Sequence, residues 1–395
     1  MAALVAARAG GRVLLIERTH EGGKKILISG GGRCNILPSE SRPDRFVTDS
    51  SPNSLRKILR GWPLDDQRAF FERELNMRLV LEPETGKLFP ETNRARDVRD
   101  GLVRSVRQAG AQLMFDTSVT DVRMCAHGWA VRGDGGSEIE AAAVILATGG
   151  LSVPNTGSDG LGLRVAQQLE HTVHSTFPAL TPLTTGPRVH GHLAGISLSV
   201  IIRSSTRPQL TTEGGFLFTH RGYSGPAVLD SSHVVTRSIE AESPRPKLMV
   251  QWTTLHREAW EAELGSGRRT VGNLLARSMP WRLAQQLLNE ATISAETPAR
   301  LLDRQSKRRL LALLTEYELP WTGNEGYKKA EVTGGGVALG EVHPGTMESR
   351  RHPGLFMCGE MLDAFGPIGG HNFQWAWATG RAAGLGAAAC AKPED

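Results

Sequence analysis

Hydrophobic and polar positions along the first part of the chain predict alternating helices and strands. Residues 1–9 are mostly small and apolar and favour a helix, which Gly10 and Gly11 end. The run 12–17 has a continuous apolar centre, as in a parallel strand buried on both faces. A longer helix is expected over 95–108. This order of elements predicts an α/β domain.

Later segments continue this pattern, with strands followed by helices. Strands are expected at 111–116, 119–124, 129–132, 142–146, 196–202, 215–219 and 248–252, a strand and turn at 353–360, and helices at 157–169, 271–276, 281–289, 303–314 and 373–389. The alternation in 196–202 favours a barrel strand, whereas the helices between 271 and 314 have the apolar spacing of a small bundle. These elements predict a separate inserted domain.

The length of the chain also predicts more than one domain. Its 395 residues exceed the roughly 250–300 at which single cores stop growing. We expect a first domain made of residues 1–177 and 326–395, interrupted by an inserted domain at 178–325.

Charge and cysteine content narrow the class of protein. The net charge is +5, but basic residues are spread out and only Lys307, Arg308 and Arg309 form a short run, so no nucleic-acid partner is expected. No stretch approaches the ~20 apolar residues that span a bilayer, so no membrane partner is expected. The four cysteines are far apart without a CxxC pair, which predicts no metal site, no disulfide framework and a reducing cytoplasm. The oligomeric state is not predicted.

An acidic residue follows the first strand. Glu17 stands at its carboxyl end, where a carboxylate can accept hydrogen bonds from a ribose diol. In a dinucleotide-binding βαβ unit, a strand and a G-x-G-x-x-G loop come before the helix, and neither precedes Met1. We therefore expect that this strand and loop are missing because the start codon is placed too late.

Glycine clusters supply further candidate binding segments. Gly22–Lys25 and Ser29–Asn35 bring consecutive glycines close to donors such as Arg33, so backbone can approach a flat or charged ligand. Ala147–Gly150 ends a strand with small residues, which leaves room for a ligand across the strand ends. Packing is favoured over a redox role for Cys34, which has no CxxC partner.

A third cluster lies near the end of the chain. Gly359 and Glu360 follow a strand, and Gly369 and Gly370 precede the last helix. The amino terminus of that helix carries partial positive charge, suited to the edge of a flavin that becomes anionic on reduction. Asp363 is the candidate partner for ribityl hydroxyls.

These segments together carry a family resemblance. The matching motifs are Gly23–Asn35, Phe89-Pro90, Ala147–Gly150, Thr156–Ser158, Thr219-His220, Ser224–Pro226, Thr333–Val337, Thr346–Ser349 and Gly359-Glu360. They resemble the BaiN and aminoacetone-oxidase-like flavoproteins, a family that also includes YhiN. The resemblance implies a Rossmann-like FAD-binding α/β domain interrupted by an inserted β-barrel and a small helical bundle. The sequence departs from the family pattern at two points: the glycine loop is absent, and His371 stands where the family commonly has Tyr.

The cofactor-binding residues expected from motifs and resemblance are Glu17, Lys24, Lys25, Ser29, Gly30, Gly31, Arg33, Cys34, Asn35, Val119, Ala147, Thr148, Gly149, Gly150, Gly359, Glu360, Asp363, Gly369, Gly370, His371 and Asn372. The resemblance implies NAD(P)H as a co-substrate, and its binding would be transient because the sequence shows no second dinucleotide fold. His371 and His220 are the candidates for proton transfer, since imidazole changes charge near neutral pH.

Three functions remain open from the sequence. The first is an FAD-dependent reductase or oxidase of a small organic molecule, such as an enone or an amine. The second is a flavin-binding regulatory protein or pseudoenzyme without fast turnover. The third is a tRNA-modifying flavoprotein, for which the sequence offers a basic charge but no basic tail.

Overall fold

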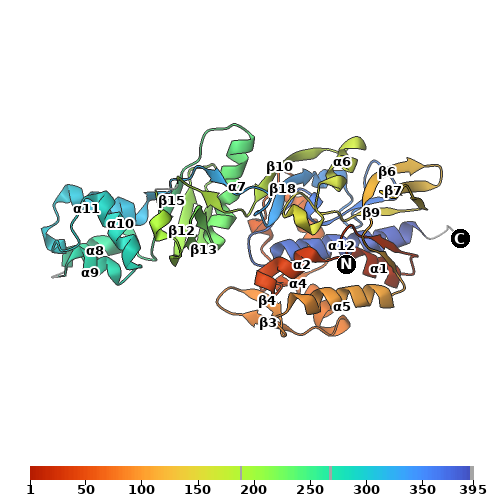
Figure 1. Cartoon of the computed structure of the whole chain (residues 1–395), viewed down its shortest axis with the longest axis horizontal. Helices are drawn as coiled ribbons and strands as arrows, with labels where there is room; N and C mark the ends of the chain where they lie inside the picture. Colours follow the sequence, from red (N-terminus) through yellow and green to blue (C-terminus); the bar gives the residue numbers. More distant parts are fainter. Residues whose placement is uncertain (187–188, 267–268, 392–395) are drawn as a thin grey trace. The chain divides into compact units, whose positions relative to one another are not determined.

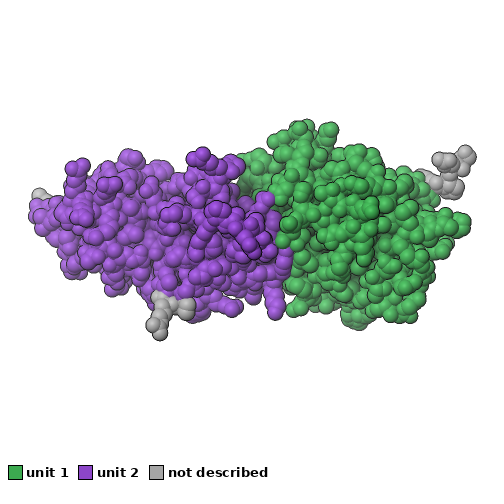
Figure 2. Space-filling view, turned by 90° about the horizontal axis from the view of Figure 1, so that it is seen from above, with its two compact units in different colours: residues 1–176, 332–395 green, residues 177–331 purple. Residues whose placement is uncertain are grey.

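The computed structural model describes residues 1–186, 189–266 and 269–391. The chain divides into two compact units, coloured separately in Figure 2. Unit 1 consists of Met1–Thr176 and Val332–Asp395, and unit 2 of Phe177–Glu331. The divisions therefore follow Thr176 and Glu331, whereas the sequence predicted them after 177 and 325.

Unit 1 contains short strands and helices from both ends of the chain (Figure 1). Its helices are α1 (Ala2–Arg8), α2 (Lys24–Ile28), α3 (Pro52–Arg60), α4 (Leu64–Ala69), α5 (Ala95–Gln108), α6 (Leu161–Gln168) and α12 (His371–Cys390). Its strands are β1 (Leu14–Ile16), β2 (Leu37–Pro38), β3 (Leu79–Glu82), β4 (Lys87–Pro90), β5 (Gln112–Met114), β6 (Val119–Cys125), β7 (Gly128–Gly133), β8 (Glu138–Ala141), β9 (Val144–Leu146), β18 (Val332–Val337) and β19 (Leu355–Met357), with β10 (Val173–Ala179) crossing the division.

Two parallel strand pairs position the glycine-rich segments. Strand β1 pairs with β5, and β9 pairs with β19 in the register Val144↔Leu355. Residues after the carboxyl ends of β9 and β19 therefore come to the same edge, because parallel strands point the same way. These residues belong to the predicted clusters Ala147–Gly150 and Gly359-Glu360.

Helix α12 begins two residues earlier than the sequence predicted. Gly370 is its N-cap, with φ of 96°, so His371 and Asn372 belong to the first helical turn and not to the preceding loop. The prediction began the helix at Phe373, because the glycine-rich run was assigned entirely to a turn. Because Gly370 adopts a left-handed conformation, the chain enters the helix directly after it, without two further loop residues.

Helices α1 and α12 pack directly against each other at small residues. A Cβ built on Gly384 of α12 would lie 2.5 Å from the carbonyl oxygen of Ala2 and 3.1 Å from Cβ of Val5. The absent side chain thus lets the two backbones approach. Two apolar cores complete unit 1, one around Trp129, Phe356 and Trp375, the other around Phe71 and Trp377.

Unit 2 combines one sheet with a group of helices (Figure 1). Its strands are β11 (Leu183–Thr184), β12 (Ser197–Ser204), β13 (Thr211–Phe218), β14 (Gly222–Ser224), β15 (Leu248–Gln251), β16 (Tyr317–Glu318) and β17 (Gly323–Asn324). Its helices are α7 (Pro226–Glu240), α8 (Arg257–Ser266), α9 (Val271–Ala276), α10 (Trp281–Ala291) and α11 (Arg304–Thr315).

The sheet of unit 2 is not the closed barrel that the sequence predicted. Its order is β16-β15-β12-β13-β14-β11-β17, so within the described residues β16 and β17 each have one strand neighbour. Edge strands of two residues each are short, which limits the exposed backbone of an open sheet. Phe216, Trp252, Trp260 and Leu287 belong to one continuous core that joins this sheet to the helices.

The described helices include none that is both long enough and apolar enough to span a membrane.

Candidate functional site

Glu360 joins the glycine-rich segments of unit 1 through a buried polar network. Its carboxylate accepts hydrogen bonds from Lys25 of α2 and Ser152, which follows the Ala147–Gly150 cluster. The backbone N–H and hydroxyl of Thr333, in β18, donate to Oε1 of Glu360 at 3.0 and 2.9 Å. The Glu360 side chain is 15% exposed. One carboxylate therefore holds segments that are far apart in the sequence.

Thr333 packs against Gly150, at a place where any side chain on residue 150 would collide with it. A Cβ built on Gly150 would lie 2.4 Å from Oγ1 of Thr333. The same Oγ1 accepts hydrogen bonds from the N–H groups of Leu151 and Ser152 at 2.7 and 3.1 Å. Sequence reasoning proposed Lys25 and Glu360 as ligands but missed Ser152 and Thr333. The glycines on either side of the network were the available signal.

One carboxylate oxygen of Asp363 accepts hydrogen bonds from the loop at residues 48–50. Its Oδ2 accepts hydrogen bonds from the Thr48 hydroxyl at 2.9 Å, the Asp49 N–H at 2.9 Å, and the Ser50 N–H and hydroxyl at 2.8 and 2.7 Å. Nε2 of His174 lies 3.7 Å from the same oxygen. Burial raises the pKa of Asp363, and the donors on Ser50 and Thr48 oppose that shift. Oδ2 thus anchors the loop, and its predicted contact with ribityl hydroxyls stays a prediction.

Three buried polar atoms around the start of α12 have no hydrogen-bond partner within the described residues. They are Oδ1 of Asn35, Nδ1 of His371 and Oε1 of Gln374. Asn35 Oδ1 lies 2.9 Å from where a Cβ on Gly370 would stand, so the three atoms surround the first turn of the helix. Buried polar groups are normally hydrogen-bonded. Their unmet capacity fits a polar ligand bound at this helix end.

His371 is held neutral by its surroundings. Burial lowers its pKa from 6.5 to about 4, and the nearby charge of Arg45 contributes in the same direction. The nearby side chain of Gln374 raises the pKa in opposition to this shift, although it makes no hydrogen bond to Nδ1 of His371. The ring packs edge-on against Phe46 at 6.0 Å between centroids. At neutral pH His371 therefore offers one donor and one acceptor and carries no charge.

The loop before α12 is fixed by Asn372 and leaves bare backbone beside it. Asn372 accepts a hydrogen bond from the Gly366 N–H and donates one to the Gly366 carbonyl, both at 2.9 Å. A Cβ on Gly359 would meet no atom within 4 Å, and one on Gly369 would meet only His371, at 3.9 Å. These two glycines present open backbone of the kind that a planar ligand can approach.

Other predicted residues are engaged by close neighbours. Glu17 follows β1, as expected, and its Oε1 accepts hydrogen bonds from the N–H and hydroxyl of Thr19 at 2.8 and 2.7 Å. Arg33 forms an ion pair with Glu82 at 2.9 Å and stacks over Phe89 at 4.1 Å. Its predicted role as an anion ligand would require exchange of the Glu82 contact.

The loop that contains Arg33 also holds Ser29, Gly30, Gly31 and Cys34. The Ser29 hydroxyl donates to the Ile26 carbonyl at 2.8 Å, and Gly30 and Gly31 have left-handed φ of 56° and 67°. Cys34 is fully buried in the core around Phe71, and burial raises its thiol pKa to about 12. The thiol is therefore a packing group, in agreement with the sequence interpretation.

The remaining predicted residues lie in both units. In unit 1, Lys24 begins α2, Val119 begins β6, and Ala147–Gly150 follows β9, where Thr148 and Gly149 lie close to Gly162 and Ser158 respectively. In unit 2, His220 lies exposed in the turn between β13 and β14. His371 belongs to unit 1.

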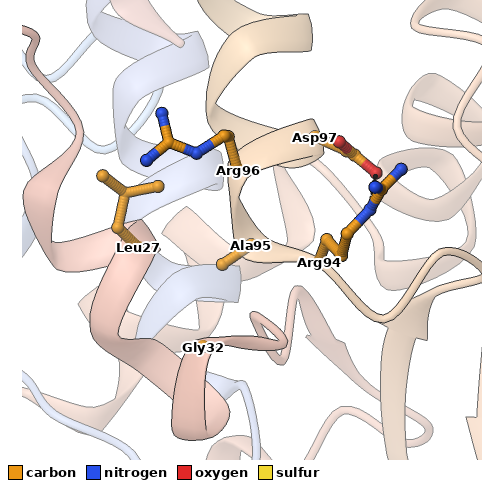
Figure 3. A pocket seen from close by; sticks show the side chains of 6 residues that line it. All are labelled: Leu27, Gly32, Arg94, Ala95, Arg96 and Asp97. Atoms are coloured by element: carbon orange, nitrogen blue, oxygen red, sulfur yellow. Dashed lines mark hydrogen bonds and ion pairs between the residues drawn. The ribbon is translucent and has the colours of Figure 1, made fainter.

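Two surface cavities open beside these segments in unit 1. One, of about 340 Å³, is lined by Leu27 and Gly32 and by Arg94–Asp97 at the start of α5 (Figure 3). Arg94 donates to Asp97 at 3.1 Å, and Arg96 lies 4.0 Å from Glu21, so both arginines already face an acid. The other, of about 410 Å³, is lined partly by His174, the neighbour of Asp363.

Comparison with known proteins assigns the chain to a family. A family model described as the HI0933-like protein Rossmann domain matches residues 1–386. The chain belongs to the HI0933-like family. This result confirms the resemblance and the Rossmann-like α/β fold class inferred from the sequence.

Curated relatives of this HI0933-like chain match nearly its whole length. A 3-dehydro-bile acid delta(4,6)-reductase of Clostridium scindens is 30% identical and covers 98% of this chain and 96% of its own. A ribosomal RNA dihydrouridine synthase of Escherichia coli is 31% identical, with coverage of 95% and 92%. Among solved structures, a 3-ketosteroid-delta4-(5alpha)-dehydrogenase of Rhodococcus jostii has a TM-score of 0.50 at 15% identity, over 98% of this chain and 94% of that one. This likeness concerns the fold.

Proposed function

We propose that this HI0933-like chain is an FAD-dependent reductase of carbon–carbon double bonds conjugated to a carbonyl group. The names of the two relatives describe reactions of this kind. A 3-dehydro bile acid has a ketone conjugated with its delta(4,6) bonds, and dihydrouridine forms when the uracil double bond beside a carbonyl is saturated. One reaction chemistry therefore covers a steroid and a nucleobase.

The observation that carries the cofactor proposal is the set of unpartnered atoms at the start of α12. Asn35, His371 and Gln374 would offer their free oxygen and nitrogen atoms to the polar edge of FAD. The helix amino terminus would favour negative charge on that edge. When bound, FAD supplies the hydride-transfer chemistry.

The chain's own residues would position the cofactor in several segments. Glu17 would accept a hydrogen bond from a ribose hydroxyl, which would replace its hydrogen bonds from Thr19. Glu360 and Lys25 would hold the surrounding glycine-rich segments together while contacting each other. Gly359 and Gly369 would admit the flavin ring against bare backbone.

His371 would act as a neutral hydrogen-bonding group. Because its pKa is lowered to about 4, His371 is not a source of protons at neutral pH. The proton that completes reduction would come from another donor, and His220 stays the sequence candidate for it. NAD(P)H is the proposed reductant, with oxygen as an alternative electron acceptor.

The test begins with the visible spectrum of the purified chain after incubation with FAD and removal of free cofactor. We expect flavin absorbance that bleaches when NADH or NADPH is added without oxygen. A 3-oxo-Δ4 steroid or a uridine-containing RNA should then restore the oxidised spectrum. Retained flavin that no nicotinamide reduces would favour the regulatory alternative. Absence of retained flavin, both in this chain and after the upstream in-frame residues are restored, would refute the proposal.

A further inference from the structure

The net positive charge of the protein is confined to unit 2. Residues 177–331 contain 19 Lys and Arg against 14 Asp and Glu, whereas the rest of the chain contains 27 of each. The whole excess of +5 therefore belongs to the unit inserted into the Rossmann-like fold. Counting charges over the complete chain hides this separation.

Part of that charge gathers on helix α11. Arg304, Arg308 and Arg309 are exposed, and within the described residues they form no ion pair or side-chain hydrogen bond. Lys307 is partly exposed and donates to the backbone carbonyl of Glu261 at 3.1 Å. On the neighbouring helix α8, the carboxylate of Glu261 lies 3.4 Å from Arg257. The α11 arginines thus present free guanidinium groups to solvent.

Arg304 is placed where its charge opposes helix formation, in the first turn of α11. The first turn of α11 contains no acidic residue, although the N-cap Asp303 accepts hydrogen bonds from the next residues. Cations near a helix amino terminus are unfavourable, and the like charges of Arg304 and Arg308 stand four residues apart on one face. An unfavourable local choice is typical of a functional surface.

We propose that this face of α11, defined by Arg304, Arg308 and Arg309, binds the phosphate backbone of a structured RNA. Guanidinium groups suit phosphate because their planar donors can form two hydrogen bonds at once. The proposal rests on the proposed function for its chemistry, since an RNA substrate would bring uracil, a conjugated carbonyl compound, to the enzyme. No nucleic-acid partner was expected from the sequence, because Lys307, Arg308 and Arg309 form only a short run in a chain whose other basic residues are spread out.

The test measures RNA binding by the full chain through fluorescence anisotropy. The probe is a fluorescein-labelled hairpin with a stem of about 16 base pairs. We expect binding that weakens steeply between about 50 and 200 mM KCl. The double variant Arg304→Glu/Arg308→Glu should bind at least about 10-fold more weakly, with a salt slope smaller by about 2.

A matched control keeps the change of charge but moves it to unit 1. Lys57 and Arg60 are exposed on α3, so Lys57→Glu/Arg60→Glu should leave RNA affinity within about 2-fold. Equal losses in both double variants would show that net charge, not this face, binds RNA. Wild-type protein that does not bind the hairpin, or that prefers phosphatidylserine vesicles, would also overturn the proposal.

The folding of the variants is checked by thermal unfolding. Glutamates in the first turns of α11 should not lower the melting temperature, because they complement the helix amino terminus. If that variant fails to fold, Arg308→Gln/Arg309→Gln supplies the same test. RNA binding needs no reductant, so RNA binding without flavin bleaching would refute the proposed function alone. Steroid reduction without RNA binding would refute the RNA-binding surface alone.

Discussion

Glu360 is held by residues from several segments, of which the sequence singled out only some. The sequence placed it with Lys25 among the cofactor-binding residues, and the structure brings the two into contact. Ser152 and Thr333 were not anticipated as their partners, because nearby glycines mark these segments but do not show which hydroxyl contacts the carboxylate. A network contributed by separate segments depends on the pairing of β9 with β19, which no local pattern specifies.

Removing the Glu360 charge should destabilise unit 1. Glu360→Gln would leave Lys25 without its counter-ion in a largely buried position, at a cost of about 2–3 kcal/mol. Urea unfolding followed by tryptophan fluorescence measures the change. Glu82→Gln removes the partner of Arg33 from an exposed pair and should cost no more than about 1 kcal/mol. Equal costs would mean that the buried network is not special.

The pH dependence of stability should report the burial of His371. Its pKa is lowered from 6.5 to about 4, so the unfolded chain takes up the proton first as pH falls. Stability present above about pH 6.5 should be lost toward pH 4, by up to on the order of 3 kcal/mol. His371→Gln should flatten this dependence in urea unfolding at pH 7 and pH 5, whereas the exposed His220→Gln should not.

A second histidine limits how much of the acid sensitivity that variant can remove. Burial also lowers the pKa of His233, in unit 2, to about 4. Part of the acid sensitivity should therefore persist in His371→Gln. A profile identical to that of the wild type would contradict the assigned burial of His371.

At the scale of elements, two helices with regular apolar spacing were predicted best. The helices over 95–108 and 271–276 have the predicted bounds, because their apolar spacing is regular. The antiparallel sheet β2-β4-β3 was not predicted, since β2 has only two residues and no alternation to read. The inserted sheet was expected to close, but closure depends on how its edge strands meet and not on the pattern within each strand.

The contact between α1 and α12 should be sensitive to side-chain volume at one position. Gly384→Val would place atoms within 3.1 Å of Ala2 and Val5 and should destabilise the protein by about 1–3 kcal/mol. Ala389→Val introduces the same side chain at an exposed site of α12 and should cost about 0.7 kcal/mol or less. Thermal unfolding compares them, and a Gly384→Val protein as stable as the control would refute this packing.

At the scale of the molecule, the two units have separate cores. The core around Phe216 and Trp252 lies in unit 2, and those around Trp129 and Phe71 lie in unit 1. The sequence predicted this division from chain length and from the change in element type. It did not predict that the net charge would be divided the same way, because charge has no periodicity that marks a domain.

Separate cores should make unfolding depart from a single transition. Leu287→Ala opens a cavity in the core of unit 2 and should reduce the stability of that unit by about 2–5 kcal/mol. The midpoint temperature of one transition should therefore fall, while that of the other stays unchanged. Calorimetry of the full chain resolves the two. One cooperative transition that shifts as a whole in the variant would show that the units unfold together.

The crossings between the units fall on neighbouring strands. Strands β10 and β18 are paired, and the chain leaves unit 1 after Thr176 and returns to it at Val332. The ends of the interruption are thus held side by side by backbone that belongs to the sheet. In evolutionary terms, insertions or deletions between β10 and β18 could enlarge or shorten unit 2 without altering the order of the strands in unit 1.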